Sequence, residues 1–556
     1  MFNSLRFKEY LPFAILVVIS LFCRIIIATY GLPYMVHVDE SQVLKDPLKI
    51  LLTYKNLDFH IPTNLYNYIL ACWHFIIYCG GFAAGKWHSM LEYQNIVARD
   101  SYNILFCFRL LNVAFSTVAD IIFLHFIIKK VNQPYIIKLS LALIIIFNPF
   151  IYNSTGFVKF DAICYLFYSI LIYWGYLYFV ENKVEYRKKL YLVAFLALST
   201  RIEEISFLAG FLFYDFYIIY KHNLKVFLKS GLPAALLPGF ILYLIITLTP
   251  LVMVYNYLYA PKVIYTTTKT FDYAIATRMG FSYISGYKYY IISSFMILSP
   301  VVILVFLFKM LRHNLSIKFL ILPLLITNFV LALFFVKNVH YFLMSSVIIL
   351  FIFVKYIEEN KNQKLSILII IFSLFYFISY DSELLYFTLK HNANDIARKV
   401  VLKNSTAKDT IVIDGICDLR IPQSPKILRE QISALKEVGG STGYGLAQRL
   451  ITSTQDSIDS RFFLTRVGDY FWGKTKYEGK WLIGYDTSTI KKINPKLIII
   501  FSHMDTLPNT YGSILKNDYT IVAENTYHFL DPRMNYKNYY FFHSFFIFKR
   551  NQPTLL

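Results

Sequence analysis

Two adjacent carboxylates follow the first apolar segment of the chain. Asp39 and Glu40 stand in the sequence GLPYMVHVDESQ, a few residues after the apolar run Leu11–Ile27. By base rate such a pair in a loop is simply solvated. Beside a membrane, however, the low local dielectric raises the basicity of a carboxylate, which can then take a proton from a hydroxyl group. Asp39 is therefore a candidate general base.

Single basic residues stand at the ends of several apolar runs. Lys159, Arg201 and Lys337 are each the single cation of a short loop. They could bind an anionic group, or their side chains could reach the membrane surface, as basic residues at span ends usually do. Arg109 could equally be a structural ion-pair partner. Arg24 lies inside the first apolar run, where an unpaired charge is costly, so we expect a partner or a lipid phosphate beside it.

The composition is that of a protein with many membrane spans. Of the 556 residues, 57% are hydrophobic and only 16% are charged, and the mean hydropathy is +0.50. Soluble proteins carry about a quarter of charged residues. Apolar runs close to the roughly 20 residues that cross the hydrocarbon layer recur along the first two-thirds of the chain. Examples are Leu11–Ile27, Ile291–Phe308, Phe319–Val336 and Ile367–Ile378. We expect His74 and His125, near such runs, to be interior or interfacial histidines.

The formal net charge of +21 does not indicate nucleic-acid binding. Lysine and arginine are divided among short loops, and the sequence contains no basic aromatic face and no nucleic-acid-binding motif. Five of the six cysteines stand in or near apolar segments, and Cys417 stands alone in the polar C-terminal part. This pattern predicts neither a disulfide framework nor a CxxC metal site.

The distribution of lysine and arginine predicts an orientation, because these residues accumulate on the cytoplasmic side. Dense basic loops alternate with loops that carry one cation. The dense loops cover residues 129–138, 183–189, 221–229, 309–318 and 355–364. The alternation places the N-terminus inside and the chain from about Asp381 outside. Asn64–Cys79 is apolar but short, and we interpret it as a juxtamembrane or re-entrant helix, which leaves about eleven transmembrane helices.

The composition changes at about Asp381. The stretch HNANDIARKVVLKNSTAKDTIVIDG has the pattern of an amphipathic helix, a turn and a buried strand, and NPKLIIIFSH is a second strand of that kind. We therefore expect a polytopic α-helical membrane domain over residues 1–380 and a soluble extracytoplasmic α/β domain over residues 381–556. The membrane domain includes a first outer loop over residues 31–102 with juxtamembrane helices.

Several short motifs follow one another in the membrane part. After the Asp39–Glu40 pair come FHIPTNLYNY in the first outer loop, FRLLN at the next span, FVKFDA with Asp161 at the head of another, and LALSTRIEE with Arg201. Their order resembles the lipid-phosphate-sugar-dependent glycosyltransferases of the C superfamily, in particular bacterial proteins similar to dolichyl-phosphate-mannose-protein mannosyltransferases. Two departures are Val38, where the family typically has proline, and His340, where an arginine usually precedes the tyrosine.

The resemblance implies an inverting transfer of a hexose or pentose from a polyprenyl-phosphate donor. Asp39 would be the catalytic base, and Glu40 and Asp161 would shape the site or orient the acceptor. The phosphate leaves as an anion, so it needs positive charge beside it and no general acid. The residues expected at the donor phosphate are Lys159, Arg201, Lys337, His340, Tyr341 and Arg109, and His60 is expected to position the donor or the acceptor.

Three alternatives remain open. One is a catalytically dead relative that serves as a scaffold, and the intact Asp39 and Glu40 argue against it. Asp39, Glu40 and Asp161 could together bind a divalent cation, although we expect no metal and no cofactor, because the mannosyltransferase branch does not clearly require one. The chain could also be a transporter or flippase of a lipid-linked glycan, a function that predicts ionisable residues near the bilayer midplane and paired broken helices. Most ionisable residues here stand at the outer ends of spans, which favours surface chemistry.

The expected partners follow from this interpretation. They are a polyprenyl-phosphate-linked sugar, membrane lipid, and an acceptor that is a protein, lipid A or a glycan. The richness in lysine, isoleucine and asparagine suggests an AT-rich bacterial genome. We therefore expect a multi-pass protein of the cell inner membrane with a cytoplasmic N-terminus and a periplasmic C-terminal domain.

Overall fold

The structure is a computed structural model in which two compact units are distinguished. One contains residues 1–28, 43–74 and 108–385, and the other contains residues 29–42, 75–107 and 386–556. The residues described are 4–32, 40, 44, 47, 48, 51, 64–99, 102–149, 151, 152, 157–201, 204–222, 231–255, 295, 298–311, 318–333, 342–390, 393–406, 409–414, 461–466, 474–477, 480–483, 494–502, 518–525 and 544–551.

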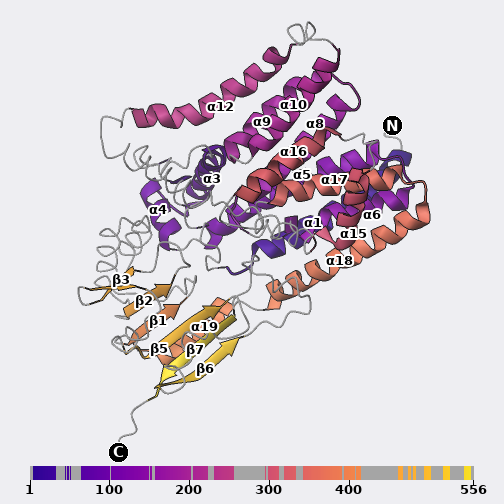
Figure 1. Cartoon of the computed structure of the whole chain (residues 1–556). Helices are drawn as coiled ribbons and strands as arrows, with labels where there is room; N and C mark the ends of the chain where they lie inside the picture. The colour runs from indigo at the N-terminus through magenta and orange to yellow at the C-terminus, as the bar shows by residue number, and fades with distance from the viewer. Residues whose placement is uncertain are drawn as a thin grey trace, which may run out of the picture. The chain divides into compact units, whose positions relative to one another are not determined.

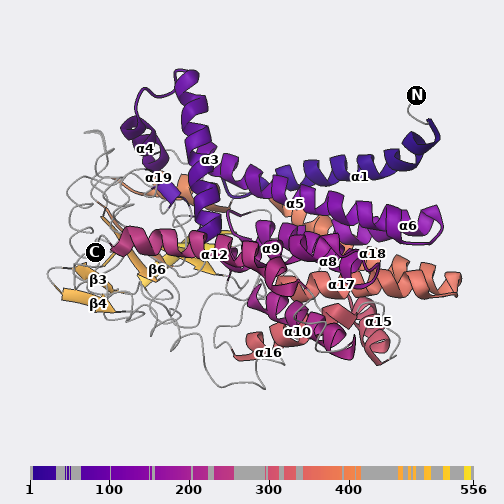
Figure 2. The ribbon, with the colours of Figure 1, turned by 90° about the horizontal axis from the view of Figure 1, so that it is seen from above.

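The first unit is helical. Helices α8, α9, α10 and α16 lie side by side in it, and α17 packs on α8, α15 and α16 (Figures 1 and 2). Three helices, α3, α5 and α18, continue from this unit into the second. The helices are α1 (Ser4–Ala28), α3 (Asn64–Ala83), α5 (Tyr102–Lys130), α6 (Tyr135–Ile146), α8 (Asp161–Phe179), α9 (Glu185–Thr200), α10 (Ile205–His222), α12 (Leu232–Tyr255), α15 (Pro300–Leu311), α16 (Lys318–Leu333), α17 (Leu343–Glu359) and α18 (Gln363–Lys390).

Among the described residues, four helical stretches are long and apolar enough to cross a membrane. They are Tyr10–Ala28, Asn103–Lys130, Asp161–Phe179 and Gln363–Asn404. Five shorter apolar helices accompany them. The interpretation of Asn64–Cys79, which lies in α3, as a juxtamembrane or re-entrant helix stays a prediction. Large apolar side chains are exposed on α1 and α18, for example Phe22 (65%) and Phe375 (75%), as lipid-facing surfaces require. The prediction of a helical membrane protein agrees with this structure, and the number of about eleven spans stays a prediction.

Glycine lets α10 and α16 approach closely. A Cβ atom added at Gly210 of α10 would lie 2.4 Å from Cγ and 2.6 Å from the backbone nitrogen of Pro323 on α16. Small residues at helix contacts are typical of membrane proteins, where close packing replaces the hydrophobic effect as the force between helices. The contact between α10 and α16 therefore depends on the missing side chain.

Replacing Gly210 by alanine is expected to destabilise the helical unit by about 1 to 3 kcal/mol, the usual cost of overpacking a close contact. The ring and backbone of Pro323 cannot move aside as a flexible side chain would. Gly80→Ala is the matched control, because no atom lies within 4 Å of the Cβ position there. Thermal unfolding in detergent measures both variants, and equal melting temperatures would contradict this role of Gly210.

The described part of the second unit contains a mixed five-stranded sheet with the order β2-β1-β5-β7-β6, in which β1 is parallel to β2 and β5 (Figure 1). The predicted helix and the two predicted strands are confirmed as α19, β1 and β5, and the predicted boundary at residue 381 falls inside α18. The elements are α4 (Met90–Arg99), α19 (Ala393–Asn404), β1 (Thr410–Asp414), β2 (Arg461–Arg466), β3 (Lys474–Tyr477), β4 (Lys480–Ile483), β5 (Leu497–Ser502), β6 (Tyr519–Asn525) and β7 (Ser544–Arg550).

Asp409 holds the starts of β1 and β5 together. Its carboxylate accepts hydrogen bonds from Lys496 Nζ (2.7 Å), just before β5, and from Thr406 Oγ1 (2.7 Å). Burial of the carboxyl group alone would raise its pKa. The hydrogen bonds from Lys496 and Thr406 lower the pKa by a larger amount, so that the pKa of Asp409 lies below its ordinary value. The amino ends of the two parallel strands are therefore joined by an ion pair.

The pKa shift of Asp409 predicts a pH-dependent contribution to stability. Because the pKa is lower in the folded than in the unfolded state, the ion pair stabilises the sheet above about pH 4 and is lost as the pH falls through the folded-state value. Asp409→Asn should therefore lower the protection of β1 and β5 amides by about 1 kcal/mol or less near neutral pH, and should have little effect in acid. Hydrogen exchange at both pH values tests this, and an effect of equal size in acid would contradict it.

Candidate functional site

The backbone of the segment Phe157–Asp161, which leads into α8, is held by Asn112 of α5. The Asn112 amide nitrogen donates hydrogen bonds to the carbonyl oxygens of Phe157 (2.6 Å) and Lys159 (3.0 Å). Its carbonyl oxygen accepts a hydrogen bond from the Tyr66 hydroxyl on α3 (3.0 Å). Both amide hydrogens and the oxygen of this buried side chain are therefore used, which holds the turn that carries Lys159 in place.

Arg109, three residues before Asn112 on α5, lies against the same segment. Its Nη1 atom donates a hydrogen bond to the carbonyl oxygen of Ala28 at the end of α1 (3.1 Å), and its guanidinium carbon lies 5.9 Å from the centre of the Phe157 ring. The side chain is fully buried. Arg109 thus places a positive charge beside the segment and also joins α5 to α1 through a backbone carbonyl oxygen.

Asp161 and Arg201 meet where α8 begins and α9 ends. Asp161 is the first residue of α8, and Arg201 is the residue directly after α9, so each charge lies at the helix end whose dipole favours it. Arg201 Nη1 lies 3.7 Å from Asp161 Oδ1, and its guanidinium carbon lies 5.1 Å from the centre of the Phe160 ring. Both side chains are buried. The pair brings a second cation to the segment that carries Lys159.

Glu204 adds a carboxylate that the sequence interpretation missed. The Tyr168 hydroxyl on α8 donates a hydrogen bond to Glu204, and the Glu204 backbone N–H donates one to the carbonyl oxygen of Arg201 (3.1 Å). Glu204 is buried. It stands three residues after Arg201 in the sequence, and that short separation from a candidate cation is the signal that could have identified it.

The structure gathers four of the predicted site residues at one segment: Arg109, Lys159, Asp161 and Arg201. Lys159 is 8% exposed and the other three are less exposed. Glu40 is buried and belongs to the second unit. The remaining predicted residues lie outside the described part of the chain: Asp39, His60, Lys337, His340 and Tyr341. The described site is therefore a cation-rich turn with two buried carboxylates, Asp161 beside Arg201 and Glu204, whose backbone N–H donates to the Arg201 carbonyl oxygen.

Arg24 has a counter-ion, as the free-energy cost of an unpaired charge in the apolar interior requires. Its Nη1 atom lies 2.8 Å from Asp120 of α5, which also accepts hydrogen bonds from the hydroxyls of Tyr165 (2.9 Å) and Ser20 (3.4 Å). Arg24 Nη2 donates to the carbonyl oxygen of Ile146 (3.5 Å). The pair is completely buried and connects α1, α5, α6 and α8. Asp120 was not singled out from the sequence.

The two histidines occupy the expected kinds of position. His74 is fully buried, its Nε2 atom lies 3.0 Å from the carbonyl oxygen of Leu44, and its ring packs on Phe108. His125 lies on the exposed face of α5, with its ring 5.8 Å from that of Tyr173. Neither histidine belongs to the cation-rich turn.

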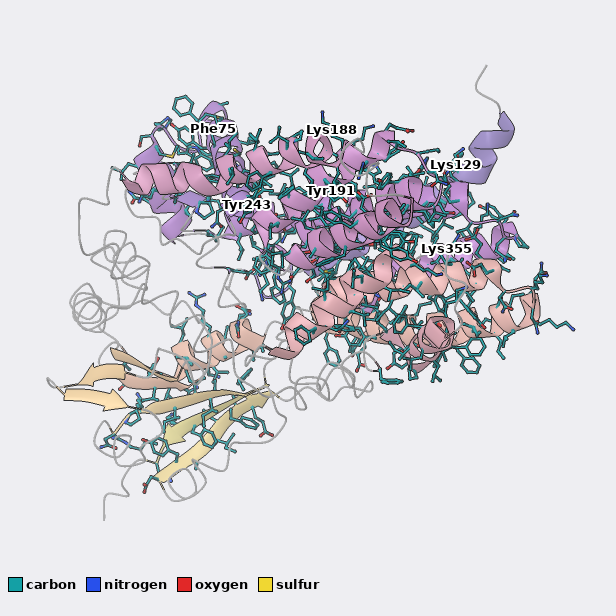
Figure 3. All side chains as sticks on the ribbon, turned by 45° about the horizontal axis from the view of Figure 1, so that its top comes forward. Phe75, Lys129, Lys188, Tyr191, Tyr243 and Lys355 are labelled. Carbon is teal, nitrogen blue, oxygen red and sulfur yellow. The ribbon has the colours of Figure 1, made fainter. Side chains whose placement is uncertain are left out.

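Another buried carboxylate, Asp215 of α10, joins three helices. It accepts hydrogen bonds from the hydroxyls of Tyr178 (2.8 Å) and Tyr191 (2.7 Å) and from Arg187 Nε (2.9 Å). Tyr191 lies among the packed helices of the first unit (Figure 3). These contacts connect the end of α8 and the first turns of α9 to α10. Asp215 therefore has a structural role, and it lies beside the end of α8 that is opposite to Asp161.

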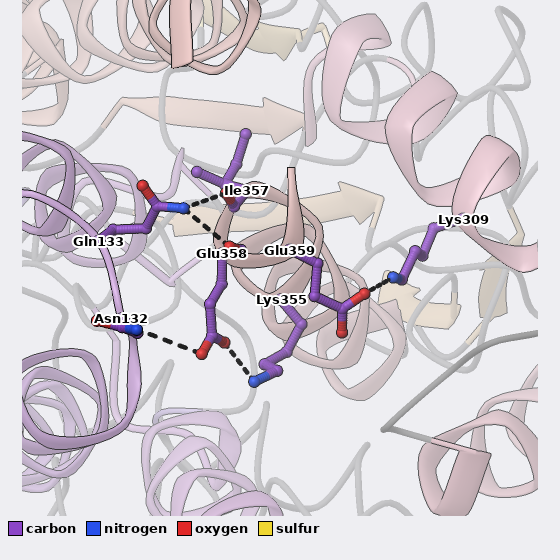
Figure 4. Close-up of polar contacts among 7 residues, drawn as sticks. All are labelled: Asn132, Gln133, Lys309, Lys355, Ile357, Glu358 and Glu359. Atoms are coloured by element: carbon purple, nitrogen blue, oxygen red, sulfur yellow. Dashed lines mark hydrogen bonds and ion pairs between the residues drawn. The ribbon is translucent and has the colours of Figure 1, made fainter. Parts of the chain in front are cut away.

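The other ends of the helices meet in a polar layer. The Gln133 side chain, just after α5, donates hydrogen bonds to the carbonyl oxygens of Ile357 (3.1 Å) and Glu358 (2.8 Å) at the end of α17 (Figure 4). Lys355 forms an ion pair with Glu358. Lys129 and Lys355 also lie toward the same end of the helices in Figure 3. The ends of α5 and α17 are therefore neighbours.

Two further ion pairs extend this layer to α8 and α15. Lys130 at the end of α5 pairs with Glu181 after α8 (2.6 Å), and Lys309 near the end of α15 pairs with Glu359 at the end of α17 (Figure 4). Four helices thus end on one side, and Asp161 at the start of α8 lies on the other. The charge pattern predicted that the lysine-rich loops share a side, and these contacts bring together the helix ends beside four of them; most of the fifth loop, residues 221–229, lies outside the described residues, and which side is cytoplasmic stays a prediction.

Within the described residues, no group of three histidine, cysteine, aspartate or glutamate side chains could hold a metal ion, but Asp39 of the proposed carboxylate set lies outside those residues.

Known proteins do not identify the chain. No family model matches the chain, and no curated protein matches it. The resemblance to the C superfamily of glycosyltransferases therefore remains a prediction from the motifs.

The buried pair of Arg24 and Asp120 predicts a non-additive pair of mutations. Asp120→Asn should cost about 3 to 5 kcal/mol, because it leaves the Arg24 charge buried without its counter-ion. The double variant Arg24→Met, Asp120→Leu should be much closer to the wild type, since it removes both charges. Thermal unfolding in detergent measures the difference, and additive effects of the two substitutions would contradict a direct pairing.

Proposed function

We propose that the chain is a membrane glycosyltransferase that takes a sugar from a polyprenyl-phosphate donor and passes it to a hydroxyl of an acceptor. The observation that carries the proposal is the gathering of Arg109, Lys159 and Arg201 around the segment Phe157–Asp161. These are cations that the sequence places in separate loops and helices. A donor phosphate that gains negative charge during transfer needs such a group of positive charges in a site of low dielectric.

The proposed reaction balances without a cofactor. The acceptor hydroxyl oxygen attacks the anomeric carbon of the sugar, and the bond from that carbon to the phosphate oxygen breaks. The polyprenyl phosphate leaves with the electron pair of that bond, and the hydroxyl proton passes to Asp39. Arg109, Lys159 and Arg201 stabilise the leaving phosphate, and Asp161 beside Arg201 orients that guanidinium or the acceptor. Glu40, His60, Lys337, His340 and Tyr341 complete the proposed site.

The two ends of the helices support an orientation for this chemistry. The layer of ion pairs around Glu358 carries the lysine-rich loops, which are typical of the cytoplasmic side. The cation-rich turn at Asp161 lies at the other end of α8. We propose that the turn faces the periplasm of a bacterial inner membrane, where the acceptor is a protein, lipid A or a growing glycan.

A transfer assay tests the function directly. Purified protein is incubated with radiolabelled polyprenyl-phosphate sugars and membranes, and the labelled product is identified. We expect transfer with one donor, and we expect Asp39→Asn to abolish it while the protein remains folded and inserted. Near-normal turnover of that variant would remove Asp39 from the role of base, and the absence of transfer with every donor would contradict the proposed function.

The cation-rich turn predicts a specific loss of transfer. Lys159→Gln and Arg201→Gln should each reduce the transfer rate by on the order of a hundredfold, the usual effect of removing one group that stabilises a developing anion. Lys188→Gln is the matched control, because Lys188 is exposed near the start of α9, whose other end leads to Arg201 (Figure 3). Equal losses in the three variants would contradict a local role of the turn.

A transporter of lipid-linked glycan is the second candidate, and one observation favours it. Asp120 and Asp215 are ionisable residues buried within α5 and α10, away from the ends of those helices where surface chemistry would need them, and Arg24 is buried beside Asp120. Each is hydrogen-bonded to its neighbours in a way that joins helices, which suits a structural role better than a transport path. Flux of a lipid-linked glycan in vesicles, without transfer from any donor, would favour the transporter.

A further inference from the structure

The part of α5 that holds the cation-rich turn also contacts the two helices that flank residues 29–63. Arg109 and Asn112 are three residues apart on α5, so they lie on one face of the helix. Arg109 Nη1 donates a hydrogen bond to the carbonyl oxygen of Ala28, the last residue of α1. The Tyr66 hydroxyl, in the first turn of α3, donates one to Asn112 Oδ1. The two flanks of residues 29–63 are therefore both bonded to the same face of α5.

The same two side chains of α5 contact the segment Phe157–Asp161. Asn112 Nδ2 donates to the carbonyl oxygens of Phe157 (2.6 Å) and Lys159 (3.0 Å). The Arg109 guanidinium carbon lies 5.9 Å from the centre of the Phe157 ring. Arg109 and Asn112 are completely buried, which removes water as a competitor for these hydrogen bonds. Two neighbouring side chains thus connect the ends of α1 and α3 to the turn that carries Lys159.

The Tyr66 hydroxyl determines which way the Asn112 amide faces. With its oxygen toward this hydroxyl, the amide directs both hydrogens at the carbonyl oxygens of Phe157 and Lys159. The reverse orientation would bring the amide oxygen against two carbonyl oxygens. A buried amide oxygen that loses its hydrogen bond carries a desolvation cost, so the hydroxyl stabilises the orientation that holds the turn.

We propose that Asn112 and Tyr66 are positioning residues of the transfer reaction, which hold the Lys159 turn in place relative to the ends of α1 and α3. Both act through the backbone of the turn. The inference rests on the proposed function, in which Lys159 stabilises the leaving phosphate and Asp39, between α1 and α3 in the sequence, takes the acceptor proton. The attacking hydroxyl and the leaving phosphate must lie on opposite sides of the anomeric carbon. A displacement of about 1 Å in such a geometry costs on the order of a hundredfold in rate.

Transfer kinetics of the full chain in lipid nanodiscs test the positioning role. Asn112→Leu should lower kcat on the order of a hundredfold, and Tyr66→Phe should lower it roughly fivefold, the effect of one neutral hydrogen bond. The KM for the donor should change less than about threefold, because the cations that bind its phosphate remain. Tyr191→Phe is the matched control, because its buried hydroxyl donates to Asp215 (2.7 Å), near the opposite end of α8. It should keep kcat within about twofold of the wild type.

A double-mutant cycle separates positioning from a general structural role. If Asn112 acts through the Lys159 turn, Asn112→Leu should cost about tenfold or less in kcat when Lys159 is already glutamine. Tyr191→Phe should have the same small effect in both backgrounds, because Asp215 and the turn lie at different ends of α8. A residue that only stabilised the fold would lower kcat by the same factor with and without Lys159.

Hydrogen exchange measures the anchoring without any reaction. The amides of residues 157–163 should exchange about tenfold faster or more in Asn112→Leu, and to a smaller extent in Tyr66→Phe, because local opening of the turn becomes easier. Tyr191→Phe should leave these amides unchanged. If the wild type transfers no sugar while the amides respond as expected, the proposed function fails and the catalytic role of Asn112 and Tyr66 fails with it, whereas the anchoring stands.

Three results would overturn the positioning role while transfer by the wild type is normal. They are unchanged exchange of the turn in Asn112→Leu, a loss of kcat in Tyr191→Phe equal to that in Tyr66→Phe, and additive losses in the cycle of Asn112 and Lys159. If Asn112→Leu does not fold, Tyr66→Phe takes its place in the cycle and in the exchange measurement. That variant removes one hydroxyl and keeps the ring on α3.

Discussion

The helical unit depends on the pairing of polar side chains along α8. Asp161 at its start lies beside Arg201, Tyr165 one turn later donates to Asp120, and Tyr168 donates to Glu204. In an apolar interior an unpaired charge or hydroxyl costs several kcal/mol, so these contacts require particular neighbours in a way that apolar packing does not. They determine which helices surround α8 and at which positions along its axis those helices contact it.

The same requirement separates the two ends of the helices. At one end, α5, α8, α15 and α17 end together in the ion pairs around Glu358 and Glu181. At the other end the chain turns into α8 at Phe157–Asp161, where Asn112 holds the backbone and Arg109 and Arg201 lie against it. Pairing at the first end neutralises the lysines with neighbouring carboxylates, whereas cations predominate at the second. That difference makes the second end suitable for an anionic ligand.

The second unit follows a comparable rule with a different architecture. The apolar interiors of β1 and β5 are buried, while Asp409 and Lys496 join the amino ends of the two strands with an ion pair. In both units, polar side chains at the ends of the elements therefore stabilise the structure through their partners.

Much of the local structure was determined by the sequence itself. Apolar runs predicted membrane helices, the pattern around IVID predicted α19 and β1, and single cations on short loops identified Lys159 and Arg201 as candidate site residues. Each of these signals lies within a few residues, because hydropathy, periodicity and loop charge are local properties. The predicted partner of Arg24 followed from the cost of an unpaired charge, although its identity did not.

Only the tertiary structure decided which distant residues meet. Asp120 is 96 residues from Arg24 in the numbering of the printed sequence, and nothing in the α5 sequence distinguishes it as that partner. Asn112 and Asp215 were missed for the same reason, since a polar residue in a helix becomes informative only when its neighbours are known. The strand order β2-β1-β5-β7-β6 also depends on pairing between distant segments. Burial and pairing are properties of the packed chain, and they arise only when the helices and strands are assembled.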